Sequence, residues 1–165
     1  MNIVFGIAGW SGSGKTELVT NLIKFITKKY KFKICAIKHA HDNFNIDHKG
    51  KDTYRFFSSG ANQIIISSKS KMAKIEKVDD EKSLTELLSK AKNADIVLVE
   101  GWKSSKIKKI EVYRKEIKKP LLHESDHSYV AVATDEKNFL PKRNIKVLDL
   151  NDVSSIADYI LNYST

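Results

Sequence analysis

Cysteine is almost absent from this chain of 165 residues, which contains Cys35 and no other. A disulfide within the chain is therefore excluded. Cys35 lies in the apolar run 34–37, where we expect it to be buried as a small hydrophobic side chain. Redox or thiolate-metal chemistry is not expected from it.

Long hydrophobic runs are also missing, since none approaches the roughly 20 residues that a membrane-spanning helix requires. The apolar start, residues 1–8, has no basic leader and continues directly into a glycine-rich loop. It is typical of a first strand and not of a signal peptide. We therefore expect a cytoplasmic protein without membrane contact, folded as a single domain over residues 1–165.

Arginine is scarce, although the formal net charge is +9. The basic residues include three arginines, Arg55, Arg114 and Arg143, and the rest are lysines. The charge is compatible with a lysine-rich solvated surface or with a functional basic surface. Proteins that read nucleic acids rely on arginine with interleaved aromatic side chains, and no such block occurs here. A nucleic-acid partner is not expected.

A glycine-rich octapeptide, Gly9-Trp10-Ser11-Gly12-Ser13-Gly14-Lys15-Thr16, follows the first apolar run and fits the phosphate-loop pattern G-x-x-x-x-G-K-[ST]. Glycines and small serines let successive backbone N–H groups approach an anion, and the following helix adds its positive dipole end. Lys15 is expected at the β- and γ-phosphates of a nucleoside triphosphate, and the Thr16 hydroxyl on Mg²⁺. The alternative is a strand-to-helix turn without a ligand.

Hydrophobic patterning places this loop in an α/β protein. Strand, helix and strand in succession imply a right-handed parallel crossover, and ligands of such sheets bind beyond the carboxyl ends of the strands. Two neighbouring strands, 63–67 and 71–78, suggest an antiparallel hairpin added to the parallel core. The other expected elements are strands 3–8, 33–38, 95–100, 109–114, 129–134 and 145–150 and helices 15–30, 52–59, 80–92 and 152–163.

The segment 38–52 follows the second strand and is rich in polar side chains. Its histidines, His39, His41 and His48, raise the possibility of a zinc site, but their spacing matches no known zinc pattern. A carboxylate in this segment could instead face Mg²⁺ and the γ-phosphate, as switch loops do. Asp47 is the first candidate and Asp52 the second, with helix capping or pairing with Arg55 as the competing role of Asp52.

The apolar strand 95–100 is flanked by two acids, Asp95 and Glu100, which lie about 16 Å apart in an extended chain. Glu100 stands at the carboxyl end, so we assign it to Mg²⁺, directly or through water, or to orienting the attacking water. Asp95 is expected to be structural. The basic loop 103–109 is most simply a solvated segment.

Asp135 follows the strand 129–134 at the same end of the expected sheet. A carboxylate there could accept hydrogen bonds from guanine N1 and N2 and so select GTP over ATP. A turn-forming role for Asp135 is the alternative.

Together these motifs resemble the molybdopterin-guanine dinucleotide biosynthesis adapter proteins, the MobB family. The resemblance covers most of the chain from Ile3 to Asp135. It is carried by residues 9–16, Ile37-Lys38-His39, Phe44, Asp47, residues 50–55, Ser59-Gly60-Ala61, residues 97–103 with Glu100-Gly101-Trp102-Lys103, and residues 109–114.

The resemblance implies a phosphate-loop NTPase fold, a three-layer α/β/α sandwich with GTP and Mg²⁺ as ligands. It also implies weak GTP hydrolysis, a homodimer, and a molybdopterin guanylyltransferase as the protein partner that the adapter assists. Glu17 stands where the family tends to have a hydroxyl residue that contacts the α-phosphate, and Asp42 where a further histidine is common. The expected nucleotide-binding residues are Gly9, Ser11, Gly12, Ser13, Gly14, Lys15, Thr16, Glu17 and Asp135, with Glu100 and Asp47 as catalytic residues and Thr16, Asp47 and Glu100 as metal ligands.

Two other functions would account for some of these sequence features. A small-molecule kinase would share the phosphate loop but needs arginines over the transferred phosphate, and the chain has three scattered arginines. A basic nucleic-acid-binding module would explain the charge alone. The GTP-binding adapter accounts for the largest number of motifs.

Overall fold

The computed structural model describes residues 2–40, 44 and 46–163. His41 and Asp42 lie outside these residues. The contacts divide the chain into two compact units, residues 1–39 with 84–165 and residues 40–83. No helix among the described residues is long and apolar enough to cross a bilayer.

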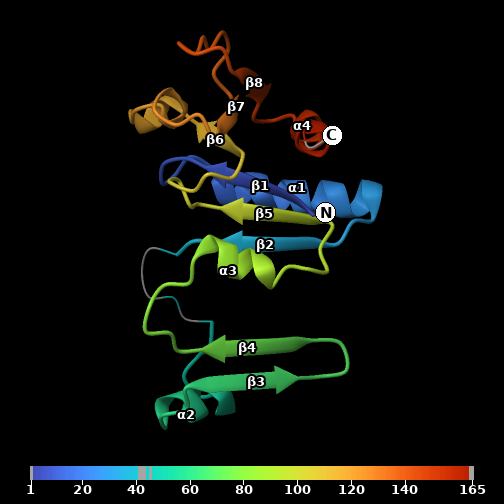
Figure 1. The fold of residues 1–165 in the computed structure, drawn as a ribbon, viewed down its shortest axis with the longest axis vertical. Coiled ribbons are helices and arrows are strands. Elements are labelled where there is room, and N and C mark those ends of the chain that lie inside the picture. Colours follow the sequence, from blue (N-terminus) through green and yellow to red (C-terminus); the bar gives the residue numbers. More distant parts are fainter. Residues whose placement is uncertain (1, 41–43, 45, 164–165) are drawn as a thin grey trace. The chain divides into compact units, whose positions relative to one another are not determined.

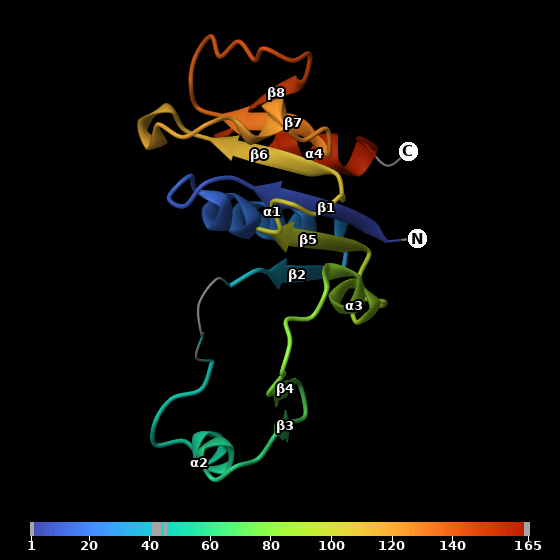
Figure 2. The ribbon, with the colours of Figure 1, turned by 60° about the vertical axis from the view of Figure 1, so that its left-hand side comes forward.

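The first unit is built on a six-stranded, fully parallel sheet. Its strand order is β2-β5-β1-β6-β7-β8, as Figures 1 and 2 show. The strands are β1 (Ile3–Ala8), β2 (Ile34–Lys38), β5 (Ile96–Glu100), β6 (Lys109–Tyr113), β7 (Tyr129–Thr134) and β8 (Lys146–Asp149). Because all six are parallel, their carboxyl ends share one edge of the sheet.

Helices cover both faces of this sheet. Side chains alternate along a strand, so in β5 Ile96 and Leu98 join the core under α1 (Lys15–Tyr30) and α4 (Val153–Tyr163). Val97 and Val99 point to the opposite face, where residues of α3 (Leu84–Ser89) cover them. Two short 3₁₀ turns, η1 (Lys115–Ile117) and η2 (Leu122–Glu124), lie between β6 and β7. The predicted α/β/α sandwich is confirmed.

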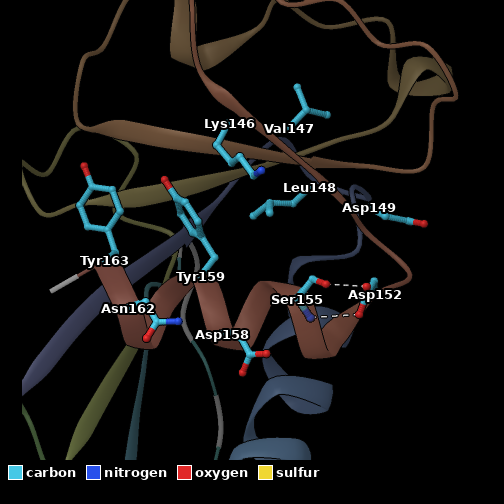
Figure 3. Close-up of a pocket in the computed structure, with 10 residues that line it drawn as sticks. All are labelled: Lys146, Val147, Leu148, Asp149, Asp152, Ser155, Asp158, Tyr159, Asn162 and Tyr163. Atoms are coloured by element: carbon cyan, nitrogen blue, oxygen red, sulfur yellow. Dashed lines mark hydrogen bonds between the residues drawn. The ribbon is translucent and has the colours of Figure 1, made fainter. Parts of the chain in front are cut away.

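Local sequence signals explain where the last helix begins. The Asp152 side chain accepts hydrogen bonds from the Ser155 backbone N–H (3.0 Å) and the Ser155 hydroxyl (2.6 Å), as Figure 3 shows. The bond from the Ser155 backbone N–H satisfies one of the N–H groups in the first turn of α4 that have no partner within the helix. The predicted start signal at Asp152 is confirmed.

The second unit contains α2 (Asp52–Ser58) and a two-stranded antiparallel sheet of β3 (Gln63–Ser67) and β4 (Met72–Glu76). The predicted hairpin is confirmed, and it forms a sheet of its own instead of extending the parallel one. Ile64 of β3 is buried, and the hairpin register places it opposite Ile75 of β4.

Most predicted element boundaries agree with the structure within two residues. The main error is α3, which was expected over 80–92 and spans Leu84–Ser89. Residues 79–83 are exposed and mostly charged, so they offer no apolar side chain that would pack this part of the segment on the sheet. Cys35, expected to be buried, is half-buried among the side chains on the α3 face.

Candidate functional site

The phosphate loop connects β1 to α1 at the carboxyl edge of the sheet. Gly12 (φ 81°) and Gly14 (φ 93°) adopt the left-handed conformation that favours glycine. At Gly9 the constraint is space, because a Cβ would lie 2.5 Å from the Val112 carbonyl oxygen of β6. Ser11 is exposed, whereas Ser13 is buried and its Oγ has no hydrogen-bond partner among the described residues.

Lys15 folds back over the loop, where its Nζ donates to the Trp10 carbonyl at 2.8 Å. Burial lowers the pKa of Lys15, and the nearby Lys103 and Lys38 act in the same direction while Glu100 opposes them. The Trp10 ring is fixed by its own N–H, which donates to the Pro120 carbonyl (2.8 Å), and the Lys103 ammonium lies 4.1 Å from the ring centroid. Several cations therefore converge on the loop.

Thr16 and Glu100 meet at the carboxyl edge, as predicted. The Thr16 hydroxyl donates to Glu100 Oε1 at 2.9 Å. Two neighbouring ligands of an octahedral Mg²⁺ with metal-oxygen distances of 2.0–2.1 Å lie about 2.9 Å apart. The oxygen pair therefore has the spacing of two adjacent magnesium ligands. Asp95 lies at the other end of the strand and accepts from the Lys33 backbone N–H (2.7 Å), which agrees with a structural role.

The residues after Glu100 fix the end of β2 against β5. Gly101 has φ 97°, and a Cβ there would lie 2.9 Å from the His39 Cβ. The His39 backbone N–H donates to the Glu100 carbonyl, and its ring stacks on Trp102 with the centroids 4.5 Å apart. Among the described residues no three His, Cys, Asp or Glu side chains form a metal-binding group. Mg²⁺ needs fewer protein ligands because phosphate oxygens and water complete its shell.

Arg114, which directly follows β6, links the phosphate loop to Asp135. Its Nε donates to the Ser13 carbonyl at 3.2 Å, and its guanidinium pairs with the Asp135 carboxylate. β6 lies next to β1 in the sheet, so the residue after β6 reaches the loop after β1. The structure thus brings the predicted base-reading residue to the loop through an arginine that the sequence alone did not single out.

Two hollows of the first unit differ in their charge. A cavity of about 170 Å³ adjoins the loop and is lined by Gly14, Glu17, Leu18, Asn21, Arg114, Leu150, Asn151 and Val153. Glu17 is exposed there and accepts from the Asn21 amide (3.0 Å). A larger groove of about 670 Å³ lies between β8 and α4, where Figure 3 shows Asp149, Asp152 and Asp158 with a single lysine, Lys146. This acidic lining disfavours phosphate.

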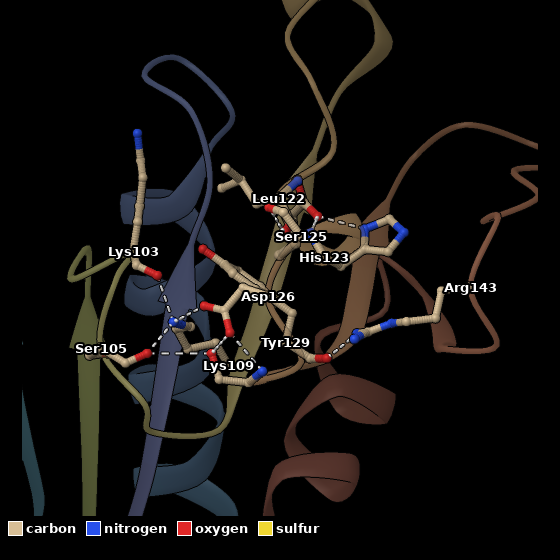
Figure 4. Close-up of polar contacts among 11 residues, drawn as sticks. Lys103, Ser105, Lys109, Leu122, His123, Ser125, Asp126, Tyr129 and Arg143 are labelled. Atoms are coloured by element: carbon tan, nitrogen blue, oxygen red, sulfur yellow. Dashed lines mark hydrogen bonds and ion pairs between the residues drawn. The ribbon is translucent and has the colours of Figure 1, made fainter.

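The expectation of a solvated loop between β5 and β6 holds for Lys106 and Lys108, which are exposed, and is wrong for Lys109, where β6 begins. Lys109 is fully buried, and Figure 4 shows its Nζ donating to the carbonyls of Lys103 (2.6 Å) and Ser105 (2.5 Å) and to Asp126 Oδ2 (3.1 Å). Although burial alone raises the pKa of Asp126, hydrogen bonds from Ser128 and Lys109 hold it at about 2. The buried ammonium therefore fixes the backbone from which Lys103 reaches Trp10.

The remaining candidates lie in the second unit. Asp47 accepts from the His48 backbone N–H at 2.9 Å and lines a cavity of about 120 Å³ with Phe44, Ile46, Tyr54, Phe57, Ser58, Ile64 and Ile75. The assignment of Asp47 to the metal stays a prediction. Asp52 is the first residue of α2, not its cap, and forms an exposed ion pair with Arg55 (3.8 Å).

Comparison with known proteins connects this site to a family. The family model for molybdopterin guanine dinucleotide synthesis protein B, MobB, matches residues 4–135. The chain belongs to the MobB family. A Haemophilus influenzae molybdopterin-guanine dinucleotide biosynthesis adapter protein is 36% identical over 162 residues, which is 97% of this chain and 88% of the relative. The Escherichia coli protein of the same name is 32% identical over 165 residues, covering 97% of this chain and 92% of the relative.

Solved MobB structures share the fold. A crystal structure of molybdopterin-guanine biosynthesis protein B aligns over 97% of this chain and 99% of that chain, with a TM-score of 0.73 and 24% identity. The Bacillus subtilis MobB structure aligns over 96% of both chains with a TM-score of 0.75 and 18% identity. The match to the MobB family extends beyond the phosphate loop through Asp135.

Proposed function

We propose that this protein is a GTP-binding adapter of molybdopterin guanine dinucleotide biosynthesis that hydrolyses GTP weakly in the presence of Mg²⁺. Membership of the MobB family and the adapter names of two relatives support the place in biosynthesis. The observation that carries the nucleotide part is the contact of Thr16 with Glu100 beside the phosphate loop.

In this proposal the backbone amides of residues 12–16 and the ammonium of Lys15 bind the β- and γ-phosphates. Lys15 would leave the Trp10 carbonyl, a neutral acceptor, for the stronger bond to an anionic phosphate oxygen. Thr16 and Glu100 would hold Mg²⁺. The bound metal would neutralise charge that develops on the phosphate oxygens.

Hydrolysis requires one water in line with the γ-phosphorus. The water oxygen bonds to phosphorus, and the bond to the β,γ-bridging oxygen breaks with its electron pair staying on GDP. One proton of the water stays on the attacking oxygen and the other passes to another oxygen of the released phosphate, which leaves as H₂PO₄⁻. In this proposal Glu100, which is buried at the carboxyl end of β5, would orient this water by accepting its hydrogen bond.

The adapter role requires a second protein. We propose the guanylyltransferase that joins GMP to molybdopterin as the partner and a homodimer as the working form, both on the strength of the family. A small-molecule kinase is less well supported, because Arg114 is held by Ser13 and Asp135 and Arg143 donates to the Tyr129 carbonyl. The third arginine, Arg55, pairs with Asp52, so each of the three arginines already has an acceptor among the described residues.

Base selection tests the nucleotide part of the proposal. Calorimetry with Mg²⁺ is expected to show GTP binding at least tenfold tighter than ATP, because Asp135 exchanges its pair with Arg114 for the N1–H and N2–H donors of guanine. Asp135→Asn is expected to lose this preference and to bind xanthosine triphosphate better, since its amide N–H can donate to the xanthine C2 carbonyl. The control is Glu136→Gln, the next acid along the chain. Equal affinities for GTP and ATP, or no binding of either, would count against the proposal.

A further inference from the structure

Lys38 ends β2 directly beside Glu100, because the parallel register pairs these two residues across β2 and β5. Its Nζ lies 3.1 Å from Glu100 Oε1 and 3.4 Å from Thr16 Oγ1. The ammonium is therefore within hydrogen-bond distance of both oxygens that have the spacing of adjacent magnesium ligands. Lys38 has no role in the nucleotide binding and hydrolysis proposed above.

Glu100 Oε1 already has two close partners. Oε1 accepts a hydrogen bond from the Thr16 hydroxyl and forms an ion pair with the Lys38 ammonium, whose own hydrogen bond goes to Thr16 Oγ1. A cation that binds Oε1 together with Thr16 Oγ1 would lie beside the Lys38 ammonium, and the two like charges would repel each other. The Lys38 side chain is 61% exposed, so it is the partner that can swing into water, whereas Glu100 is 11% exposed and remains.

We propose that the Lys38 ammonium is a built-in counter-cation that competes with Mg²⁺ for the Thr16–Glu100 oxygen pair. The biological role of this competition rests on the proposed nucleotide function. Its test does not, because metal binding can be measured without nucleotide. When Lys38 occupies the pair, one positive charge stays near the phosphates without metal. When Mg²⁺ occupies it, Lys38 is released, and like-charge repulsion between the two weakens metal binding.

The competition predicts a specific phenotype for Lys38→Met, which removes the charge and keeps most of the apolar stem. Mn²⁺, used as a spin probe for the magnesium site, is expected to bind the protein–GTP complex about tenfold more tightly in Lys38→Met, measured by electron paramagnetic resonance. The ratio of the GTP dissociation constant in EDTA to that in Mg²⁺ is expected to rise by about tenfold. Both changes follow from loss of the internal competitor.

The matched control is Lys33→Met, which removes an exposed lysine next to the opposite end of β2. It is expected to leave both the Mn²⁺ affinity and the ratio unchanged. Equal values in Lys38→Met and wild type, or weaker Mn²⁺ binding in Lys38→Met, would overturn the inference. Circular dichroism confirms that each variant is folded.

The Mn²⁺ titration is repeated without nucleotide so that the two proposals can fail separately. If no variant binds GTP, the proposed function is wrong, and tighter Mn²⁺ binding by nucleotide-free Lys38→Met than by wild type would still support the competition. Equal Mn²⁺ affinities of nucleotide-free Lys38→Met and nucleotide-free wild type would contradict the competition. GTP binding with an unchanged metal dependence would retain the function and reject the inference.

Discussion

Lys15→Ala is expected to abolish GTP binding, with the dissociation constant rising by at least about 100-fold. The ammonium is the one side-chain cation within the loop, and its loss leaves the phosphate charge to backbone dipoles and to cations on other segments. Isothermal titration calorimetry with Mg²⁺ and GTP measures the change directly. The same variant is expected to lose any stimulation of guanylyl transfer when it is added to a purified molybdopterin guanylyltransferase.

Lys24→Ala is the matched control for this experiment. Lys24 is an exposed lysine on the same helix, α1, so the substitution removes the same charge away from the loop. It is expected to change GTP affinity by less than threefold or so, as a screened surface charge does. If Lys15→Ala binds GTP as well as Lys24→Ala does, residues 9–16 are not a phosphate-binding loop.

Glu100→Gln is expected to leave GTP affinity within a few-fold of wild type and to slow hydrolysis on the order of 100-fold. The glutamine keeps the shape and one acceptor oxygen but loses the charge that binds the cation and polarises water. Single-turnover hydrolysis of radiolabelled GTP, with protein in excess, detects even a slow reaction. Calorimetry on the same preparation separates binding from chemistry.

Asp95→Asn controls for the loss of an acid next to the same strand. Its side chain can still accept the hydrogen bond from Lys33, and it lies at the end of β5 remote from Thr16. Its hydrolysis rate is expected to match wild type. A Glu100→Gln variant that hydrolyses GTP at the wild-type rate would remove Glu100 from the mechanism.

Much of the first unit follows from the sequence because its signals are local. The phosphate loop, the strand 129–134 and the helix 15–30 are marked by glycine spacing or by hydrophobic periodicity, and the structure has them at the predicted residues. Glu100 could be chosen over Asp95 because strand direction decides which end faces the loop. That reasoning needs no knowledge of which strands are neighbours.

The roles of Lys38, Lys103 and Arg114 could not be predicted in the same way. Each role depends on the strand order or on the path of a loop across the sheet. Neither can be read from a single sequence. The burial of Lys109 shows the same limit, because a lysine in a basic segment resembles a solvated one until carbonyls from residues 103 and 105 surround its ammonium. Lys38 was visible as the last residue of a predicted strand, but its place beside Glu100 required the register.

A crystal structure of the protein with Mg²⁺ and a non-hydrolysable GTP analogue shows where the triphosphate and its metal bind. We expect the amides of residues 12–16 to surround the β-phosphate, and Thr16 Oγ1 and Glu100 Oε1 to bind the magnesium ion, with Lys38 displaced from them. A triphosphate bound elsewhere, or a magnesium ion remote from both Thr16 and Glu100, would contradict this expectation.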